Sequence, residues 1–380
     1  MPEPLIKPIQ LGDNLTIEHP VALAPMAGVT NWPFRLLCRE MGCGLVVTEF
    51  VSDKAILFDS KRTQEMIELL DEERPAGIQI FGADADEMAR AAVRVVELQQ
   101  PDLVDINMGC PAPKVTKGRG GSSLLKEPDT AEEIIRRVVR AVAPLPVTVK
   151  IRIGWDANSI NAVEMAKRVE AAGARMLTVH GRTREQHYSG NADWEVIASV
   201  ADAISLPVIG NGDITTPEQA AHRLRTSGVA GLAIGRGAMG NPWIFRRTAH
   251  YLETGELLPE PDARERVETA LRHLQMMIAY RGEYIGVREM RKHAAWYLKG
   301  LYGSAAVRDR VNQTETPDAM RDVLLRYLEQ TEQYALEQAG AADLEVEAPQ
   351  SCDAYSEDGP GCEVEGGLGA QFPDCVAKGE

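Results

Sequence analysis

Strand-like apolar runs alternate with helical patterns eight times in the first two thirds of this chain. The runs cover residues 21–28, 45–52, 76–83, 103–110, 147–155, 176–183, 207–214 and 231–240. Helical periodicity is clear between several of them, at residues 84–99, 129–142, 161–172 and 216–226. Eight strand and helix pairs within roughly 240 residues predict an α/β chain folded as a (β/α)₈ TIM barrel.

One motif also fits a competing architecture, the doubly wound sheet. Residues 235–240 have the G-x-G-x-x-G spacing of a dinucleotide fingerprint, which requires a later strand ending in an acidic residue. No such strand follows, because Asn241-Pro242 begins a long helical pattern. We therefore interpret these glycines as the phosphate-binding turn that barrels place after strands 7 and 8.

Three parts are predicted along the chain. Pro259-Glu260-Pro261 has the composition of a linker and ends a barrel domain at residues 1–258. Residues 262–338 show helical patterns only, which predicts a smaller C-terminal helical bundle domain. Residues 340–380 are acidic, rich in glycine and almost without aromatics, so we expect a disordered acidic tail.

The net charge of −15 would disfavour a nucleic-acid partner if it were spread evenly along the chain. Residues 339–380 contain ten Asp or Glu and one Lys, a net of −9, which leaves −6 for everything before them. An RNA partner is therefore compatible with the composition, provided that the folded chain has a local basic face.

The number and spacing of the cysteines and the hydropathy of the chain indicate where in the cell the protein is located. Six cysteines at irregular spacing, without a signal peptide, indicate a reducing cytoplasm rather than a disulfide framework. No apolar run reaches the roughly 18 residues of a membrane span, so we expect a soluble cytoplasmic protein without membrane contact. Cys38 and Cys43 lack the further ligands of a metal site, and we predict no metal. Nothing in the sequence indicates an obligate protein partner.

Cys110 stands where a buried strand turns outward. The apolar run that begins at Leu103 stops at Gly109, and Cys110-Pro111 then changes the chain's direction at the carboxyl end of the strand. A cysteine at that place can be a positioned proton donor or nucleophile. It can equally be a small buried hydrophobic residue, as most free cysteines are.

Motifs that contain polar or glycine residues recur where the predicted strands end. They include Pro25, Met26 and Ala27 before Gly28, then Gln79, Lys150, Arg152, His180, Arg182, Asn211, Gly212, Asp213, Gly235 and Arg236. In a barrel these ends meet at one mouth. Glycine amides and an arginine suit a phosphate, and a lysine suits the anionic side of a reduced flavin, so the set fits a planar, phosphorylated redox ligand. For Lys150, a structural ion pair and a Schiff base are the alternatives.

A basic stripe is predicted in the helical domain. On a helix at residues 287–301, apolar residues fall on one side and four cations on the other. The cations are Arg288, Arg291, Lys292 and Lys299. Four aligned cations allow several phosphate contacts, although an ordinary solvated helix face has the same pattern.

The sequence around Cys110 resembles a known active-site loop. The pattern N-x-G-C-P-x-x-x-V from Asn107 to Val115, followed by the Gly-rich residues 117–125, is similar to that of the tRNA-dihydrouridine synthases. From about residue 15 to 337 the chain resembles the bacterial B-type branch of that family. The resemblance implies that Cys110 is the general acid and that Asn107, Arg152 and His180 lie near a flavin and a uracil. It implies bound FMN contacted by Pro25, Met26, Ala27, Gln79, Lys150, Asn211, Gly212, Asp213, Gly235 and Arg236.

The same resemblance implies an activity. We expect an FMN-dependent enzyme that reduces the C5–C6 bond of uridines in tRNA, in the D-loop, with NADPH as the electron source. The resemblance also assigns tRNA binding to the helical domain, which makes Arg288, Arg291 and Lys292 candidate substrate contacts. Two alternatives stay open: a small-molecule flavoenzyme of the dihydroorotate dehydrogenase kind, and a non-catalytic RNA-binding protein.

Overall fold

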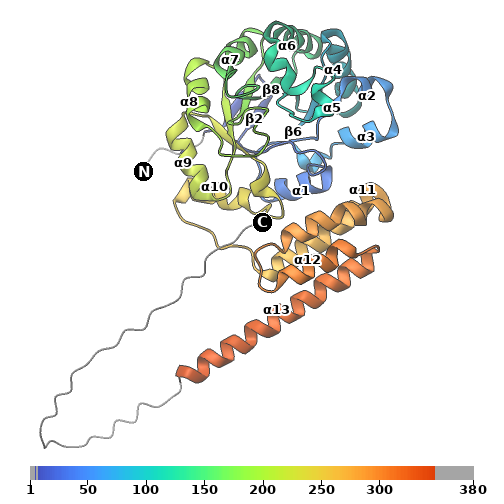
Figure 1. The fold of residues 1–380 in the computed structure, drawn as a ribbon, viewed down its shortest axis with the longest axis vertical. Helices are drawn as coiled ribbons and strands as arrows, with labels where there is room; N and C mark the ends of the chain where they lie inside the picture. Colours follow the sequence, from blue (N-terminus) through green and yellow to red (C-terminus); the bar gives the residue numbers. More distant parts are fainter. Residues whose placement is uncertain (1–4, 6, 347–380) are drawn as a thin grey trace, which may run out of the picture. The chain divides into compact units, whose positions relative to one another are not determined.

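The computed structural model describes residue 5 and residues 7–346 of the 380-residue chain. Parallel strands lie at its centre (Figure 1). They follow one another in the order β3-β11-β10-β9-β8-β7-β6-β4, and β5 also pairs with β6. The strands are β3 (Val21–Leu23), β4 (Val46–Val47), β5 (Val51–Ser52), β6 (Ala76–Phe81), β7 (Leu103–Met108), β8 (Val147–Arg152), β9 (Met176–His180), β10 (Val208–Asn211) and β11 (Gly231–Ile234).

Strand β3 and the residue just before β4 bring the sheet round into a barrel. Ala22 of β3 and Leu45 form a parallel bridge, and the Leu23 amide donates to the Leu45 carbonyl at 2.9 Å. Each of the eight predicted runs contains a strand, and the second run contains two short ones, β4 and β5. The predicted TIM barrel is therefore confirmed. In every run except the second, the strand ends before the run does, so the last residues of these seven runs form loops of the mouth.

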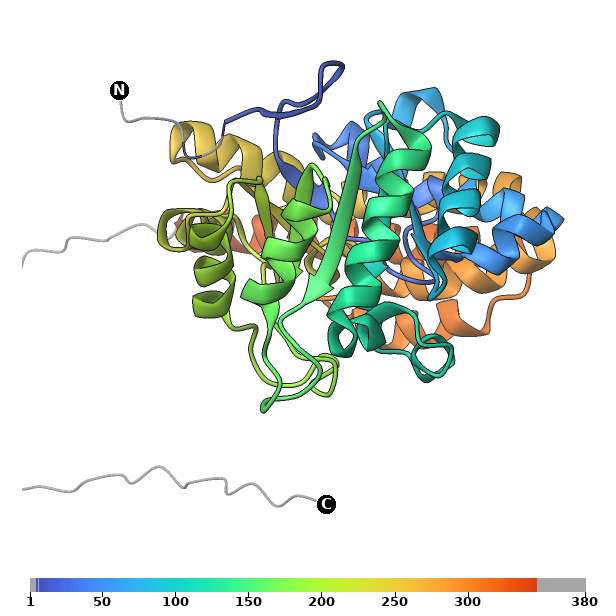
Figure 2. The same cartoon turned by 90° about the horizontal axis from the view of Figure 1, so that it is seen from above.

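Helices lie outside the strands (Figures 1 and 2). They are α1 (Trp32–Glu40), α2 (Asp53–Phe58), α3 (Lys61–Ile67), α4 (Ala85–Gln99), α5 (Pro113–Thr116), α6 (Pro128–Val142), α7 (Ala162–Ala171), α8 (Trp194–Ala203), α9 (Pro217–Ser227) and α10 (Ile244–Thr254), with 3₁₀ turns η1 (Asp71–Glu73), η2 (Gly121–Lys126) and η3 (Arg236–Ala238). Side-chain caps begin several of them. Thr216 accepts a hydrogen bond from the Gln219 amide at 3.3 Å, which starts α9 as the sequence predicts.

A hairpin that the periodicity did not reveal precedes the barrel. Strands β1 (Ile9–Leu11) and β2 (Leu15–Ile17) pair antiparallel. Their buried side chains pack with Leu103 of β7, Met176 of β9 and other residues at the starts of the strands. The hairpin therefore covers the amino-terminal end of the barrel, which leaves the carboxyl-terminal end for a ligand.

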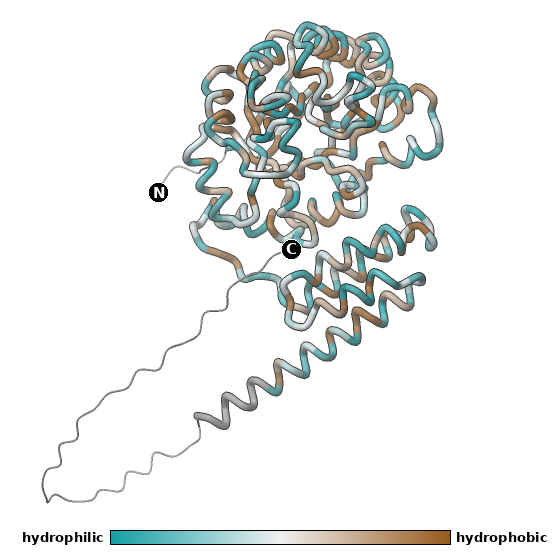
Figure 3. Tube along the Cα trace, viewed as in Figure 1, coloured by the Kyte–Doolittle hydropathy of each residue, from teal (hydrophilic) through white to brown (hydrophobic). Residues whose placement is uncertain are grey.

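Three helices follow the barrel: α11 (Ala263–Tyr297), α12 (Ser304–Gln313) and α13 (Pro317–Val346). They have their own core, which includes Leu274, Met290 and Leu324. In Figure 3 these helices alternate between hydrophilic and hydrophobic colours along their length, as helices with one apolar face do. Helix α11 is broken at Gly282, where φ is +73°. Residues through Thr331 form one compact unit with the barrel, and residues from Glu332 form a second unit.

The end of the helical region differs from the prediction. Residues 340–346, expected to begin the disordered acidic tail, still belong to α13, because Ala, Leu and Glu favour helix. Residues 347–380 of the predicted tail lie outside the described residues. Within the part that the structure describes, no helix is long and apolar enough to span a membrane.

Candidate active site

Strand β8 directs two cations to the mouth of the barrel. Lys150 and Arg152 are two residues apart, so both side chains point to the same face of the strand. The Lys150 ammonium donates to Asn211 Oδ1 at 3.2 Å, and Asn211 Nδ2 donates to the Ala233 carbonyl at 2.7 Å. Because the Ala233 contact fixes the orientation of the Asn211 amide, its oxygen faces the lysine.

An amide network connects β6 and β7. Asn107 Oδ1 accepts from the amides of Gly109 at 3.1 Å and Cys110 at 2.8 Å, so its NH₂ group must point away from them. That group donates to Gln79 Oε1 at 2.8 Å. Gln79 Nε2 in turn donates to Asp105 Oδ2 at 2.6 Å. Both ends of the Gln79 amide are thus engaged, and one of its two N–H groups remains for a ligand.

Asp105 is a buried carboxylate that the sequence analysis gave no role. Thr148 donates to its other oxygen at 2.5 Å. Burial raises the pKa of Asp105, while the bonds from Gln79 and Thr148 and the charge of Lys150 oppose that shift. Its place in the network could have been suspected from the alternation Asp105, Asn107 along one strand, because alternate residues share a face.

Below Lys150 the barrel is packed. Its interior contains a cavity of about 20 Å³, lined among others by Pro25, Asp105 and Lys150. This volume is enough for roughly one water molecule. A ligand as large as a flavin therefore has to lie above Lys150, among the loops of the mouth.

The Cys110 loop is held closely. The Cys110 carbonyl accepts from the Ser122 amide at 3.2 Å and the Ser122 hydroxyl at 2.9 Å. Gly121 has a φ of +58°, and a Cβ there would lie 2.9 Å from the Cys110 carbonyl oxygen, so only glycine fits. The cysteine is 7% exposed. Burial raises the pKa of its thiol, and the nearby Arg152, Lys114 and Lys150 only partly oppose this, so the thiol is protonated at neutral pH.

Arg152 connects the loops that follow β7 and β9. Its Nε donates to the Gly109 carbonyl at 2.9 Å, and Nη1 donates to the carbonyls of Thr183 at 2.8 Å and His187 at 2.9 Å. Burial lowers the pKa of Arg152 to about 10, so it is still charged at neutral pH. Arg152 therefore holds these two loops together and places a positive charge at the mouth.

His180 is 8% exposed. Burial, followed by the charges of Lys150, Arg152, Arg182 and Arg236, holds its pKa far below the usual range for histidine. The imidazole is therefore neutral. Four cations around one neutral ring give the site a positive potential that favours an anionic ligand.

The turn after β10 combines a glycine and a carboxylate. Gly212 has a φ of +135°, and a Cβ there would lie 2.4 Å from Ala192 Cβ. Asp213 accepts from Arg182 at 2.8 Å and from the Ala192 amide at 2.7 Å. Arg236 Nη2 donates to the same carboxylate at 3.2 Å. Partial burial raises the pKa of Asp213, but these bonds outweigh it and the net shift is downward. Asp213 thus orients the two arginines.

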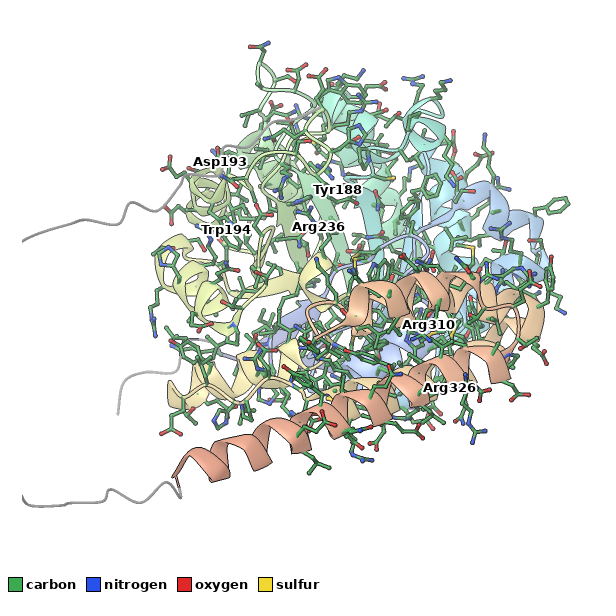
Figure 4. All side chains as sticks on the ribbon, turned by 60° about the horizontal axis from the view of Figure 1, so that its bottom comes forward. Tyr188, Asp193, Trp194, Arg236, Arg310 and Arg326 are labelled. Atoms are coloured by element: carbon green, nitrogen blue, oxygen red, sulfur yellow. The ribbon has the colours of Figure 1, made fainter. Side chains whose placement is uncertain are left out.

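Two further residues complete this side of the mouth: Arg182, which the sequence places after the sixth predicted strand, and Tyr188, which was not predicted. Arg182 is 2% exposed and bonds to Asp213. Tyr188 is 56% exposed, with the Arg236 guanidinium 5.0 Å and the Arg152 guanidinium 5.8 Å from its ring centre (Figure 4). In the sequence, Tyr188 is an aromatic residue shortly after the predicted sixth strand and a few positions from two arginines. This pattern was the available signal for its place at the mouth.

The predicted basic stripe has intramolecular partners. Arg288 stacks on Tyr284, with its guanidinium 3.7 Å from the ring centre, and Arg291 Nε donates to the Thr314 carbonyl at 2.7 Å. Lys292 donates to the Gly28 carbonyl of the barrel. The helix ends at Tyr297 rather than at residue 301, so Lys299 is not on it.

Cys38 and Cys43 are both buried and free. Across the described residues there is no group of three or more His, Cys, Asp or Glu side chains that could bind a metal ion.

A half-buried lysine, a neutral histidine and a protonated cysteine meet at one mouth of a TIM barrel, the end where such barrels carry their active sites, and this set suits an oxidoreductase of the flavin-dependent class. Comparisons with known proteins agree with this class. The family model described as dihydrouridine synthase (Dus) matches residues 22–336. The chain belongs to this family.

Relatives support the same family. A protein of Pseudomonas syringae pv. tomato named tRNA-dihydrouridine synthase B is 46% identical over 305 residues, covering 80% of this chain and 90% of the relative. A protein of the same name from Xanthomonas campestris pv. campestris is 45% identical over 304 residues, covering 80% and 91%.

Solved structures show the fold at low sequence identity. The crystal structure of TcOYE with pHBA is 14% identical, with a TM-score of 0.51 over 69% of this chain and 96% of that chain. Histamine dehydrogenase from Rhizobium sp. 4-9 is also 14% identical, with a TM-score of 0.51 over 72% of this chain and 51% of that chain.

Proposed function

We propose that this enzyme reduces the C5–C6 bond of uridines in tRNA, in the D-loop, to 5,6-dihydrouridine, with FMN as cofactor and NADPH as electron source. The relatives' names support the reaction and the substrate. The observation that carries the proposal is the presence, at one mouth, of a half-buried cation, Lys150, and a thiol, Cys110, that stays protonated. A cytoplasmic location follows from the tRNA substrate.

The residues present fit FMN. Among the described residues, the Lys150 ammonium has one hydrogen bond, to the neutral Asn211, so it can accept an anionic partner. Its place favours the anionic side of the reduced flavin ring, with the remaining N–H of Gln79 for the ring edge. The turns at Gly212 and Gly235, with Arg236, suit the phosphate. When bound, FMN would supply the hydride for C6 of the uracil.

Cys110 supplies the proton to C5. A thiol with a raised pKa is a store of protons at neutral pH and a poor nucleophile, which suits a general acid. Asn107 binds the Cys110 amide, so the amide network that reaches Gln79 also positions the acid. His180 is neutral and surrounded by cations, which makes it a weaker candidate for proton donation.

The substrate is an RNA rather than a free pyrimidine. The family match extends to residue 336 and so includes α11 and α12, which a small-molecule reductase would not need. A uridine must leave its base stack to reach the mouth of the barrel, and Tyr188 offers an exposed aromatic wall there.

Two measurements test the proposal together. Denatured protein should release FMN and no FAD, identified by chromatography. Purified holoenzyme with NADPH should form dihydrouridine in tRNA from a strain that lacks the gene. Release of a different cofactor, or oxidation of dihydroorotate by the bound flavin with no effect on tRNA, would contradict the proposal.

A further inference from the structure

Gly28 is held at both of its peptide groups by side chains from different parts of the chain. Its amide donates to Glu49 Oε2 at 2.5 Å, just after β4, and its carbonyl accepts from the Lys292 ammonium of α11. The residue has a φ of +71°, and a Cβ there would lie 3.3 Å from Lys292 Nζ. The left-handed backbone at Gly28 therefore presents both groups to charged partners.

This glycine lies in the loop that carries three of the predicted flavin contacts, Pro25, Met26 and Ala27. The loop is short and tied internally, because the Met26 amide donates to Thr30 Oγ1 at 3.1 Å. Its start reaches the site directly. Pro25 lines the same small cavity as Lys150, and a Cβ at Gly235 would lie 3.5 Å from Met26 Sδ. A shift of Gly28 would therefore be transmitted to the residues at the proposed flavin.

The packing of α11 explains why Lys292 points at this loop. The next residue, His293, is buried against Phe34 of α1, with ring centres 5.8 Å apart, and against His273, at 4.6 Å. Asn31, which caps α1, donates to Met277 Sδ at 3.4 Å. Because α1 begins directly after the loop, contacts that hold α11 against α1 also hold α11 beside the loop. Lys292, the residue before the buried His293, then lies next to Gly28.

The surroundings of Lys292 suit an internal contact better than an RNA contact. Glu49 is partly buried, and burial raises its pKa, while the nearby Lys292 and Arg35 lower it and Glu289 raises it further. A phosphate that approached Lys292 would meet these two carboxylates. The lysine is half-buried and already bonded to the Gly28 carbonyl.

We propose that Lys292 is a positioning residue for the flavin site: from the helical region it holds the Gly28 carbonyl, and with Glu49 it sets the conformation of the flavin-contacting loop. This rests on the proposed function, since it assigns the loop to FMN. It also gives α11 a role in the barrel's chemistry in addition to contact with tRNA.

The test uses the full-length protein stripped of flavin and titrated with FMN. Lys292→Met should raise the FMN dissociation constant about tenfold, the size expected for the loss of a charge-assisted hydrogen bond, and should change the visible spectrum of the bound flavin. Lys292→Arg, which can still donate to the carbonyl, should restore most of both. Affinity of the FMN-saturated protein for tRNA should stay within about twofold of wild type.

The matched control is Arg272→Gln. Arg272 also connects α11 to the barrel, through an ion pair with Glu40 of α1, but does not touch the flavin loop. It should leave FMN affinity and the flavin spectrum unchanged. If Lys292→Met does not fold, Glu49→Ala provides the second variant, since it removes the other contact of Gly28 and should also weaken FMN binding.

Three results would overturn the inference. One is wild-type FMN affinity and spectrum in Lys292→Met together with weaker tRNA binding, which would make the lysine an RNA contact. Another is an equal loss in Arg272→Gln, which would indicate general loosening between α11 and the barrel. The third is wild-type FMN affinity in Glu49→Ala. Failure of the wild-type protein to bind FMN would instead refute the proposed function.

Discussion

Burial shifts the pKa values of three site residues toward their uncharged forms. It raises the pKa of Cys110, lowers that of Lys150 to about 8 and lowers that of His180 far below neutrality. For the cysteine and the histidine this leaves a protonated thiol and a neutral ring. For the lysine it leaves a cation close to losing its proton, which an anionic ligand would stabilise.

The affinity of the flavin-free protein for FMN should therefore fall as pH rises from about 7 to about 9.5. Lys150 is charged below its lowered pKa and neutral above it, while the FMN phosphate is doubly charged throughout this range. Fluorescence titration at each pH measures the dissociation constant. Lys150→Met should bind FMN more weakly at pH 7 and show little change up to pH 9.5. A wild-type affinity that stays constant would contradict the role of Lys150.

Helix α1 is joined to the rest of the barrel by one buried arginine. Arg35 Nε bonds Glu73 of η1 at 2.5 Å, with both side chains at most 1% exposed, and Arg35 also donates to the Thr30 carbonyl at 2.9 Å. Burial raises the pKa of Glu73 in spite of this pair. Removal of one partner from a buried pair leaves an unpaired charge, which is costly.

Arg35→Met should consequently lower the free energy of unfolding by about 3–5 kcal/mol. Arg272→Gln, which breaks the exposed pair with Glu40, should lower it by about 1 kcal/mol or less. Denaturant unfolding of both flavin-free variants measures the difference. Similar losses in the two variants would mean that the buried pair has no special role in stability.

Elements with strong periodicity could be predicted from the sequence, and short or contact-dependent ones could not. The eight strands and α4, α6, α7 and α9 have the expected places, because burial imposes a period on each. Strands β1 and β2 have three residues each, too few for a period to be recognised. Capping and helix propensity did not reveal where α11 ends or that α13 continues into the acidic segment.

In the site, too, residues on or next to strongly periodic strands could be predicted from the sequence, and residues whose roles depend on contacts could not. Cys110 follows β7, and Lys150 and His180 lie at or near the carboxyl ends of β8 and β9, three strands with clear patterns, so the barrel places all three at one mouth. The roles of Asp105, Arg182 and Tyr188 depend on which neighbours the strand register and the β9 loop supply. The direction of Lys292 depends on how α11 packs on α1, and a helical wheel contains no such information.

At the scale of the molecule, a chain with a net charge of −15 is proposed to bind an RNA. That requires the cations of α11 to act locally. Arg288 Nη1 donates to the Tyr284 carbonyl at 3.0 Å and its Nη2 lies 3.9 Å from Glu315 Oε1, while Arg291 Nε donates to the Thr314 carbonyl. Each guanidinium has five N–H groups, so both keep further donors for a phosphate. Since Lys292 faces the barrel, these two arginines are the candidates on this helix for phosphate contact.

Replacement of Arg288 and Arg291 by Ala should weaken tRNA binding and flatten its dependence on salt, by roughly one unit of slope for each lost phosphate contact. Binding measured at several salt concentrations gives the slope. Arg136 and Arg137, which pair with glutamates on α6, provide a control of equal charge, and their double Ala variant should keep the wild-type slope. Equal slopes in all three proteins would show that this face of α11 does not bind tRNA.

Cys110 is the proposed proton donor of a flavin-dependent reduction, and Cys110→Ala tests this role by separating the two half-reactions. The phosphate turns, Lys150 and the amide network do not depend on the thiol. Stopped-flow measurement should show NADPH reducing the bound flavin at the wild-type rate, while dihydrouridine formation in tRNA falls by about 10²–10⁴-fold. Uridine reduction near the wild-type rate, or loss of both half-reactions together with the flavin, would contradict the account.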